Sequence, residues 1–199
     1  MDISDLLNSA MGQSIVQSVA GQLGLDEKEA SGAVHVAVPA ILAGMTKNVQ
    51  SQDGAASLNN ALESKHDGSL LDNLSGMLQG HTQELQSDGD GILGHVFGNK
   101  REAVEQGIAQ KSGISANKIG PLLAILAPIV MAYLGKEKRQ TNTGTGGLGG
   151  LLGGLLGGSN QQSGNAGGGI MDMLGGVLDK DGDGNPLDDL LGGFLGGKR

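Results

Sequence analysis

The chain has 199 residues and a formal charge of −8 at pH 7, and its aromatic residues are only Phe97, Tyr133 and Phe194. A core with so few rings must be built from aliphatic side chains, which favours helix-on-helix packing over a thick β-sandwich. The negative charge argues against binding nucleic acid, because both partners carry the same sign. The lack of cysteine excludes disulfides and thiolate metal sites and is compatible with a reducing compartment. We expect an all-α fold from the aliphatic core and a cytoplasmic location by default.

The first 140 residues contain an internal repeat. A shift of 89 residues places Gly113 on Gly24 and Pro128 on Pro39. In each copy, one helix is predicted to end at the glycine, and the proline is predicted to bend or interrupt a second, more apolar helix. Two such helix-turn-helix units around a shared core predict a compact helical bundle over residues 1–140.

The longest apolar run, Leu122 to Leu134, falls short of the roughly 20 residues that a membrane span needs. We therefore expect a buried helix there. The N-terminus begins with acidic residues where a secretory signal needs a basic region, which agrees with a cytoplasmic location. Membrane contact is expected only at the periphery, not as a transmembrane segment.

Composition changes near residue 140, after which 21 of the 38 glycines occur. Glycine weakens a helix by up to about 1 kcal/mol per site relative to alanine. Residues 141–169 are therefore predicted to be a Gly/Leu-rich flexible linker. Five leucines in this stretch lie near helical spacing, which leaves a short apolar helix as the other interpretation: Leu148, Leu151, Leu152, Leu155 and Leu156.

Residues 170–199 predict a short helix-loop-helix around an acidic loop. Calcium takes six to eight oxygen ligands, and an EF-hand loop supplies carboxylates from alternate positions. Asp179, Asp181 and Asp183 occupy positions one, three and five of such a loop, and Asn185 offers its backbone carbonyl at position seven. The glutamate expected at position twelve is replaced by leucine, so Asp188 at position ten is the predicted closing ligand for Ca2+.

The sequence contains a partial copy of this loop that favours a simpler interpretation. Residues 67–74 match 183–190 but lack the upstream acid pair, so the shared half is compatible with a turn that leads into a helix. On that interpretation, the evidence for a calcium site is limited to Asp179, Asp181 and Asp183, because these three carboxylates repel one another unless a cation is bound. A second fragment, residues 88–91, has only two acids and is a weaker candidate.

Other chemistry is sparse. The four histidines show no metal-ligand spacing: His35, His66, His81 and His95. Neither a nucleophile elbow nor a phosphate-binding loop is found in the sequence, so no enzymatic activity is predicted. A small basic cluster of Lys136, Lys138 and Arg139 is most simply the C-terminus of a helix, with contact to an anionic partner as the alternative.

Three segments together resemble a known bacterial family: GILGHVFG at residues 91–98, KREAVEQGIAQKSGI, and KIGPLLAILAPIVMAYLGK, followed by a Gly/Leu-rich tail with LDKDGDG. The family is catalogued only as domain of unknown function 937 and is related to the YidB-like proteins. The resemblance covers nearly the whole chain. It implies an all-helical bacterial protein and supplies no established activity or catalytic residues.

We therefore expect a non-enzymatic protein that binds calcium through its C-terminal loop and acts as an interaction or scaffold module. Its partner is expected to be another protein or a second copy of the chain. The alternative is a peripheral membrane-associated or self-assembling protein that uses the Gly/Leu-rich tail.

Overall fold

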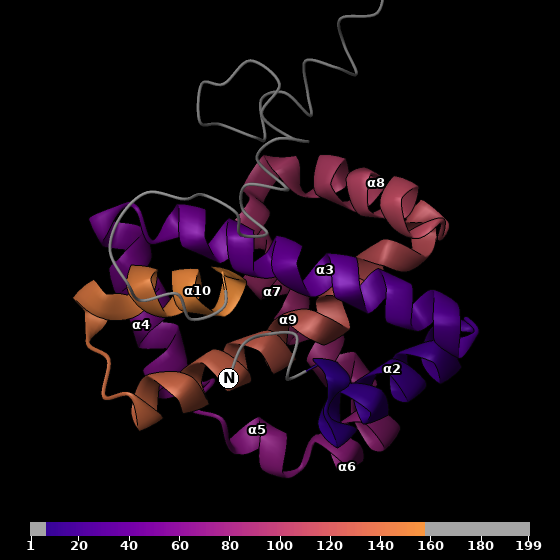
Figure 1. Cartoon of the computed structure of the whole chain (residues 1–199), viewed down its shortest axis with the longest axis horizontal. Coiled ribbons are helices and arrows are strands. Elements are labelled where there is room, and N and C mark those ends of the chain that lie inside the picture. Colours follow the sequence, from indigo (N-terminus) through magenta and orange to yellow (C-terminus); the bar gives the residue numbers. More distant parts are fainter. Residues whose placement is uncertain (1–6, 158–199) are drawn as a thin grey trace, which may run out of the picture.

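The computed structural model describes residues 7–157, and this part of the chain contains helices and no strand. The predicted all-α fold is confirmed (Figure 1). The α-helices are α2 (Ala10–Leu23), α3 (Glu27–Asn48), α4 (Gln52–Ser64), α5 (Ser69–Asp72), α6 (Leu74–Gly80), α7 (Thr82–Phe97), α8 (Arg101–Ser112), α9 (Ala116–Gln140) and α10 (Leu148–Gly157). Two short 3-10 turns, η1 (Gly98–Lys100) and η2 (Thr145–Gly147), precede α8 and α10.

Helix α9 forms the centre of the core. Every residue from Leu122 to Gly135 is buried, and α9 packs against α2, α3, α4, α5, α7 and α8 (Figure 1). A helix that is apolar on all sides needs neighbours on all sides, and the surrounding helices provide them. The buried helix predicted over Leu122 to Leu134 is confirmed.

By length and composition alone, α9 would also be able to cross a membrane. Of its most apolar 18-residue window, 83% is buried inside the protein. Because the central helix of a compact domain passes the same test, this is weak evidence for a membrane span.

The pairs α2–α3 and α8–α9 have matching boundaries. Gly24 and Gly113 both have left-handed backbones, with φ of 57° and 75°, and each ends the first helix of its pair. The second helices begin 89 residues apart. Pro39 and Pro128 each lie inside a continuous helix, so the predicted interruption of the helix does not occur. Burial of the flanking residues outweighs the backbone hydrogen bond that each proline removes.

Two glycines let other chain segments approach α9 at backbone distance. A Cβ atom on Gly89 of α7 would overlap the backbone carbonyl of Ala124, and one on Gly135 of α9 would overlap the backbone carbonyl of His66. These close approaches place α7 and the turn after α4 directly on the central helix.

The structure changes the prediction for the start of the Gly/Leu-rich segment. Residues 148–157 were predicted to belong to a flexible linker, but they form α10, which packs against α3. The leucine stripe explains the difference, since four of its members are buried: Leu148, Leu152, Leu155 and Leu156. Tertiary burial therefore outweighs the poor helix propensity of glycine. Ahead of α10, residues 141–147 form a turn and η2. The end of the predicted linker, 158–169, and the predicted helix-loop-helix, 170–199, lie outside the described residues.

Candidate functional site

The predicted calcium ligands lie outside the described residues. Asp179, Asp181, Asp183, Asn185 and Asp188 all follow residue 157, so the structure places none of them. The calcium site stays a prediction from the sequence.

The partial copy of the acidic loop does lie within the described residues. Gly68 has a left-handed backbone with φ of 98°, and the Asp67 carboxylate accepts a hydrogen bond from the Ser69 backbone N–H at 3.0 Å. Helix α5 follows at once. This segment therefore folds as a turn that leads into a helix, as the simpler interpretation of the shared half predicts.

The weaker acidic candidate, residues 88–91, is not a loop. It lies inside α7, where Asp88 faces His66 and Asp90 pairs with Arg101. Over residues 7–157, no group of three or more histidine or carboxylate side chains is arranged to hold a metal ion.

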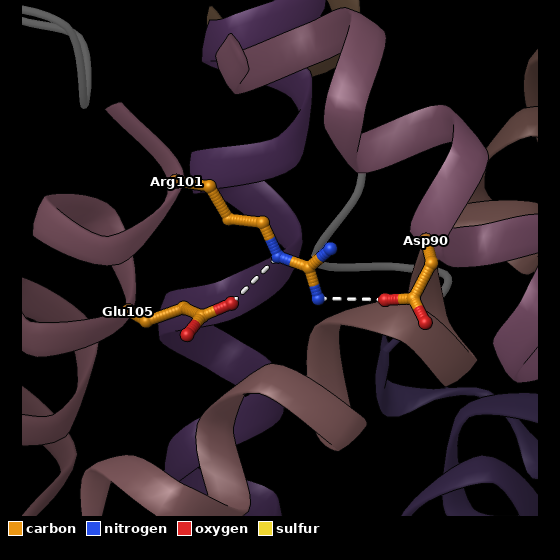
Figure 2. A network of polar contacts seen from close by, with 3 residues as sticks. All are labelled: Asp90, Arg101 and Glu105. Atoms are coloured by element: carbon orange, nitrogen blue, oxygen red, sulfur yellow. Dashed lines mark hydrogen bonds and ion pairs between the residues drawn. The ribbon is translucent and has the colours of Figure 1, made fainter. Parts of the chain in front are cut away.

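The most developed polar arrangement in the described part of the chain is centred on Arg101 of α8. Its guanidinium donates from Nη2 to Asp90 Oδ1 at 2.6 Å and from Nε to Glu105 Oε1 at 2.7 Å. Figure 2 shows the guanidinium held between the two carboxylates, one from α7 and one from α8. Burial lowers the pKa of Arg101, but the hydrogen bonds to Glu105 and Asp90 outweigh this effect and raise it above its ordinary value.

This arrangement borders an open cleft of about 550 Å³ between α7, α8 and the first half of α9. The floor includes Gly120 and Ala124 of α9, and Gly120 lies against the Glu105 carboxylate. The polar walls are formed by Gln86, Asp90, Asn99, Arg101, Glu102, Glu105 and Asn117. Carboxylates, amides and a fixed guanidinium bind and orient polar groups, and the cleft lining contains no hydroxyl, thiol or imidazole.

Loss of the Arg101 guanidinium is expected to destabilise the protein modestly. Arg101→Met keeps the aliphatic stem but leaves the Asp90 and Glu105 carboxylates without their shared cation. Because all three side chains are partly exposed to water, we expect the free energy of unfolding to fall by about 1 kcal/mol in urea denaturation.

The matched control for this change is Lys111→Met, at an exposed position on the same helix. It should alter the free energy of unfolding by less than about 0.5 kcal/mol. Equal effects of the two substitutions would show that the Arg101 pairs contribute nothing specific.

His66 is the one histidine that the described residues enclose. Only 5% of its surface is exposed, and its Nε2 lies 3.7 Å from Asp88 Oδ2 of α7. Burial lowers the pKa of His66, Asp88 acts in the opposite direction, and Lys65 lowers the pKa further. The other three histidines are exposed. No spacing or motif in the sequence distinguishes His66 from them, because its burial depends on tertiary packing.

The lowered pKa of His66 makes stability depend on pH. Between its ordinary value of 6.5 and the lower value in the folded protein, the unfolded chain binds more protons than the folded protein. The free energy of unfolding should therefore be fully developed above about pH 6.5 and fall as the pH is lowered below that value. Denaturation in urea at a series of pH values measures this dependence.

Substitution of the histidines tests the assignment. His66→Gln should flatten the pH dependence below about pH 6.5, whereas His35→Gln, at an exposed position on α3, should leave it unchanged. A pH profile that His66→Gln does not alter would contradict the account.

Two members of the basic cluster at the end of α9 form ion pairs within the protein. Lys138 is 8% exposed and donates to Glu63 Oε1 at 2.6 Å, and Arg139 donates to Asp67 Oδ2 at 3.1 Å. The hydrogen bond from Lys138 lowers the pKa of Glu63. These pairs tie α4 and the following turn to α9, which agrees with the structural interpretation of the cluster.

Comparison with protein-family profiles matches residues 5–137 to "Bacterial protein of unknown function (DUF937)". No curated protein and no solved structure matches the chain. The matched range covers α2 to α8 and most of α9, and it ends before α10. Since the match extends over more than half of the sequence, the chain belongs to the DUF937 family of bacterial proteins of unknown function.

Proposed function

We propose that this protein is a non-enzymatic, cytoplasmic calcium-binding module, in which the helical domain is a scaffold and the C-terminal segment responds to the ion. One observation carries the proposal: Asp179, Asp181 and Asp183 alternate along the chain and are followed by Gly184. This order supplies oxygen ligands from positions one, three and five and a glycine for the sharp turn at position six. Asn185 and Asp188 complete the proposed ligand set.

The charge and the domain architecture support this proposal. A net charge of −8 attracts cations and opposes binding to nucleic acid. In the described part of the chain, Arg101, Lys138 and Arg139 are already paired with carboxylates. These cations are therefore engaged within the domain and do not compete for the acidic segment. That segment follows α10 in the sequence, and α10 packs against α3.

Calcium titrated into the full-length protein, followed by far-ultraviolet circular dichroism, tests the response. Binding should order the segment around the loop, so helicity should rise as calcium approaches millimolar concentration. The double variant Asp181→Ala, Asp183→Ala should show no rise. Asp72→Ala is the matched control, because Asp72 is the counterpart of Asp188 in the partial copy, and it should behave as the wild type. A wild-type spectrum that calcium does not change would contradict a calcium response.

Self-assembly is a second candidate, favoured by one feature of α10. Four of its glycines are exposed and form two pairs with a spacing of four residues: Gly149 with Gly153, and Gly150 with Gly154. Small residues at this spacing let another helix approach closely. Light scattering coupled to size-exclusion chromatography should then report oligomers of the full-length chain, and Gly149→Leu with Gly153→Leu should dissociate them. A monomer at all concentrations would exclude this candidate. Lipid contact at the periphery receives no comparable support, since α9 is buried and four of the five leucines of α10 are buried as well.

A further inference from the structure

Helix α10, which follows the central helix α9 in the sequence, has an unusual composition. Its sequence is LGGLLGGLLG, so half of its residues are glycine and none carries a polar side chain. We propose that α10 is a releasable strap: it detaches from α3 and unfolds while α2 to α9 stay folded. This inference does not depend on calcium binding.

The glycines of α10 are not required by the packing. A Cβ atom on Gly149, Gly150, Gly153 or Gly154 would meet no atom within 4 Å, and none of these residues has a left-handed backbone. Alanine would therefore fit at all four positions in the docked helix. Gly89 and Gly135 differ, because there a Cβ would overlap the backbone of a neighbouring segment.

Glycine at open, helical positions lowers the stability of the helix and brings no gain in packing. A segment of ten residues is also too short to be helical in water without tertiary contacts. It follows that α10 is a helix only while it is docked, and that leaving α3 and unfolding are one event.

Docking depends on leucine burial. Leu148, Leu152, Leu155 and Leu156 are each at most 4% exposed, and Leu151 is partly buried. The apolar side chains of α10 form no ion pair and no side-chain hydrogen bond. Burial of this kind is non-directional, so the contact can break and re-form without loss of a specific polar partner.

The connection to the domain allows such a release. The turn after α9 contains Asn142, with a left-handed φ of 50°, and a hydrogen bond from the Thr143 backbone N–H to the Lys138 carbonyl at 3.0 Å closes it. The stretch from Thr141 to Gly157 would extend to on the order of 55 Å once α10 has unfolded. Release would therefore let residue 157 move tens of ångströms away from α3.

Amide hydrogen exchange on the full-length protein tests the strap. The amides of residues 152–157 bond within α10, so they exchange when it opens. They should be protected, but exchange at least 100-fold faster than the amides of Leu126 to Leu134 in α9. In the variant Gly149→Ala, Gly153→Ala, which makes the helix easier to form, exchange of residues 152–157 should slow by about 10- to 30-fold, with no matching change in α9.

The matched control is Gly91→Ala, Gly94→Ala on α7, where both glycines are exposed and a Cβ likewise meets nothing within 4 Å. It should leave the exchange of residues 152–157 unchanged. The proposal is overturned if these amides exchange as slowly as those of α9, if they are unprotected in the wild type, or if alanine in α10 has no more effect on them than alanine in α7.

Discussion

Gly89→Ala is expected to lower the free energy of unfolding by about 3 kcal/mol. The added methyl group would overlap the backbone carbonyl of Ala124 in the first half of the central helix. A flexible side chain would turn aside, but here α7 and α9 must separate, and this loosens the largest helix–helix contact in the described domain. Since a domain of this size is stable by only about 5–15 kcal/mol, the loss is a large fraction of the total.

Gly91→Ala is the matched control for this change, two residues further along α7. A Cβ on Gly91 meets nothing within 4 Å, so the substitution removes a helix-weakening glycine without a clash. We expect it to be neutral or to stabilise by up to about 1 kcal/mol. Urea denaturation followed by circular dichroism measures both variants. Equal free energies of unfolding for the two would contradict the close approach of α7 to α9.

Leu134→Ala should be comparably damaging, with a loss of about 3 kcal/mol. Leu134 belongs to the buried face of α9, and its exposed fraction is 0%. Truncation removes the apolar contacts and leaves a cavity that the surrounding helices cannot fill without moving.

The comparison for Leu134→Ala is Leu58→Ala, at a partly buried position of α4. Because its side chain already has contact with water, we expect a loss of about 1 kcal/mol or less. If Leu134→Ala were no more damaging than Leu58→Ala in the same denaturation experiment, α9 would not be the centre of the core.

Local signals in the sequence predict the helical framework well. Gly24 and Gly113 end their helices in the left-handed conformation because that backbone suits glycine. The apolar run from Leu122 to Leu134 is long enough to need burial on every side, and the structure buries it. Each of these predictions depends on a few consecutive residues.

The linker prediction shows where local signals mislead. Glycine content alone predicted a flexible chain over residues 141–169, whereas the leucine spacing within it allowed a helix. The outcome for residues 148–157 depended on whether α3 offered a surface for those leucines, and this is a tertiary property.

The ion pairs of Arg101 and His66 also depend on tertiary packing, so the sequence alone does not predict them. Asp90 and Arg101 belong to different helices, and the distance between them depends on how η1 turns the chain from α7 into α8. His66 and Asp88 meet only because the turn after α4 and α7 both pack close to the central helix. No spacing rule links residues brought together in this way.

Calorimetry of calcium binding to the full-length protein tests the proposed function most directly. We predict one calcium ion per chain. The dissociation constant should be about 10⁻⁴–10⁻³ M, weaker than in calcium sensors, because aspartate replaces the usual closing glutamate. The heat of binding should vanish in Asp181→Ala, Asp183→Ala and persist in Asp72→Ala. No heat up to several times that concentration, or binding that the double variant retains, would contradict the account.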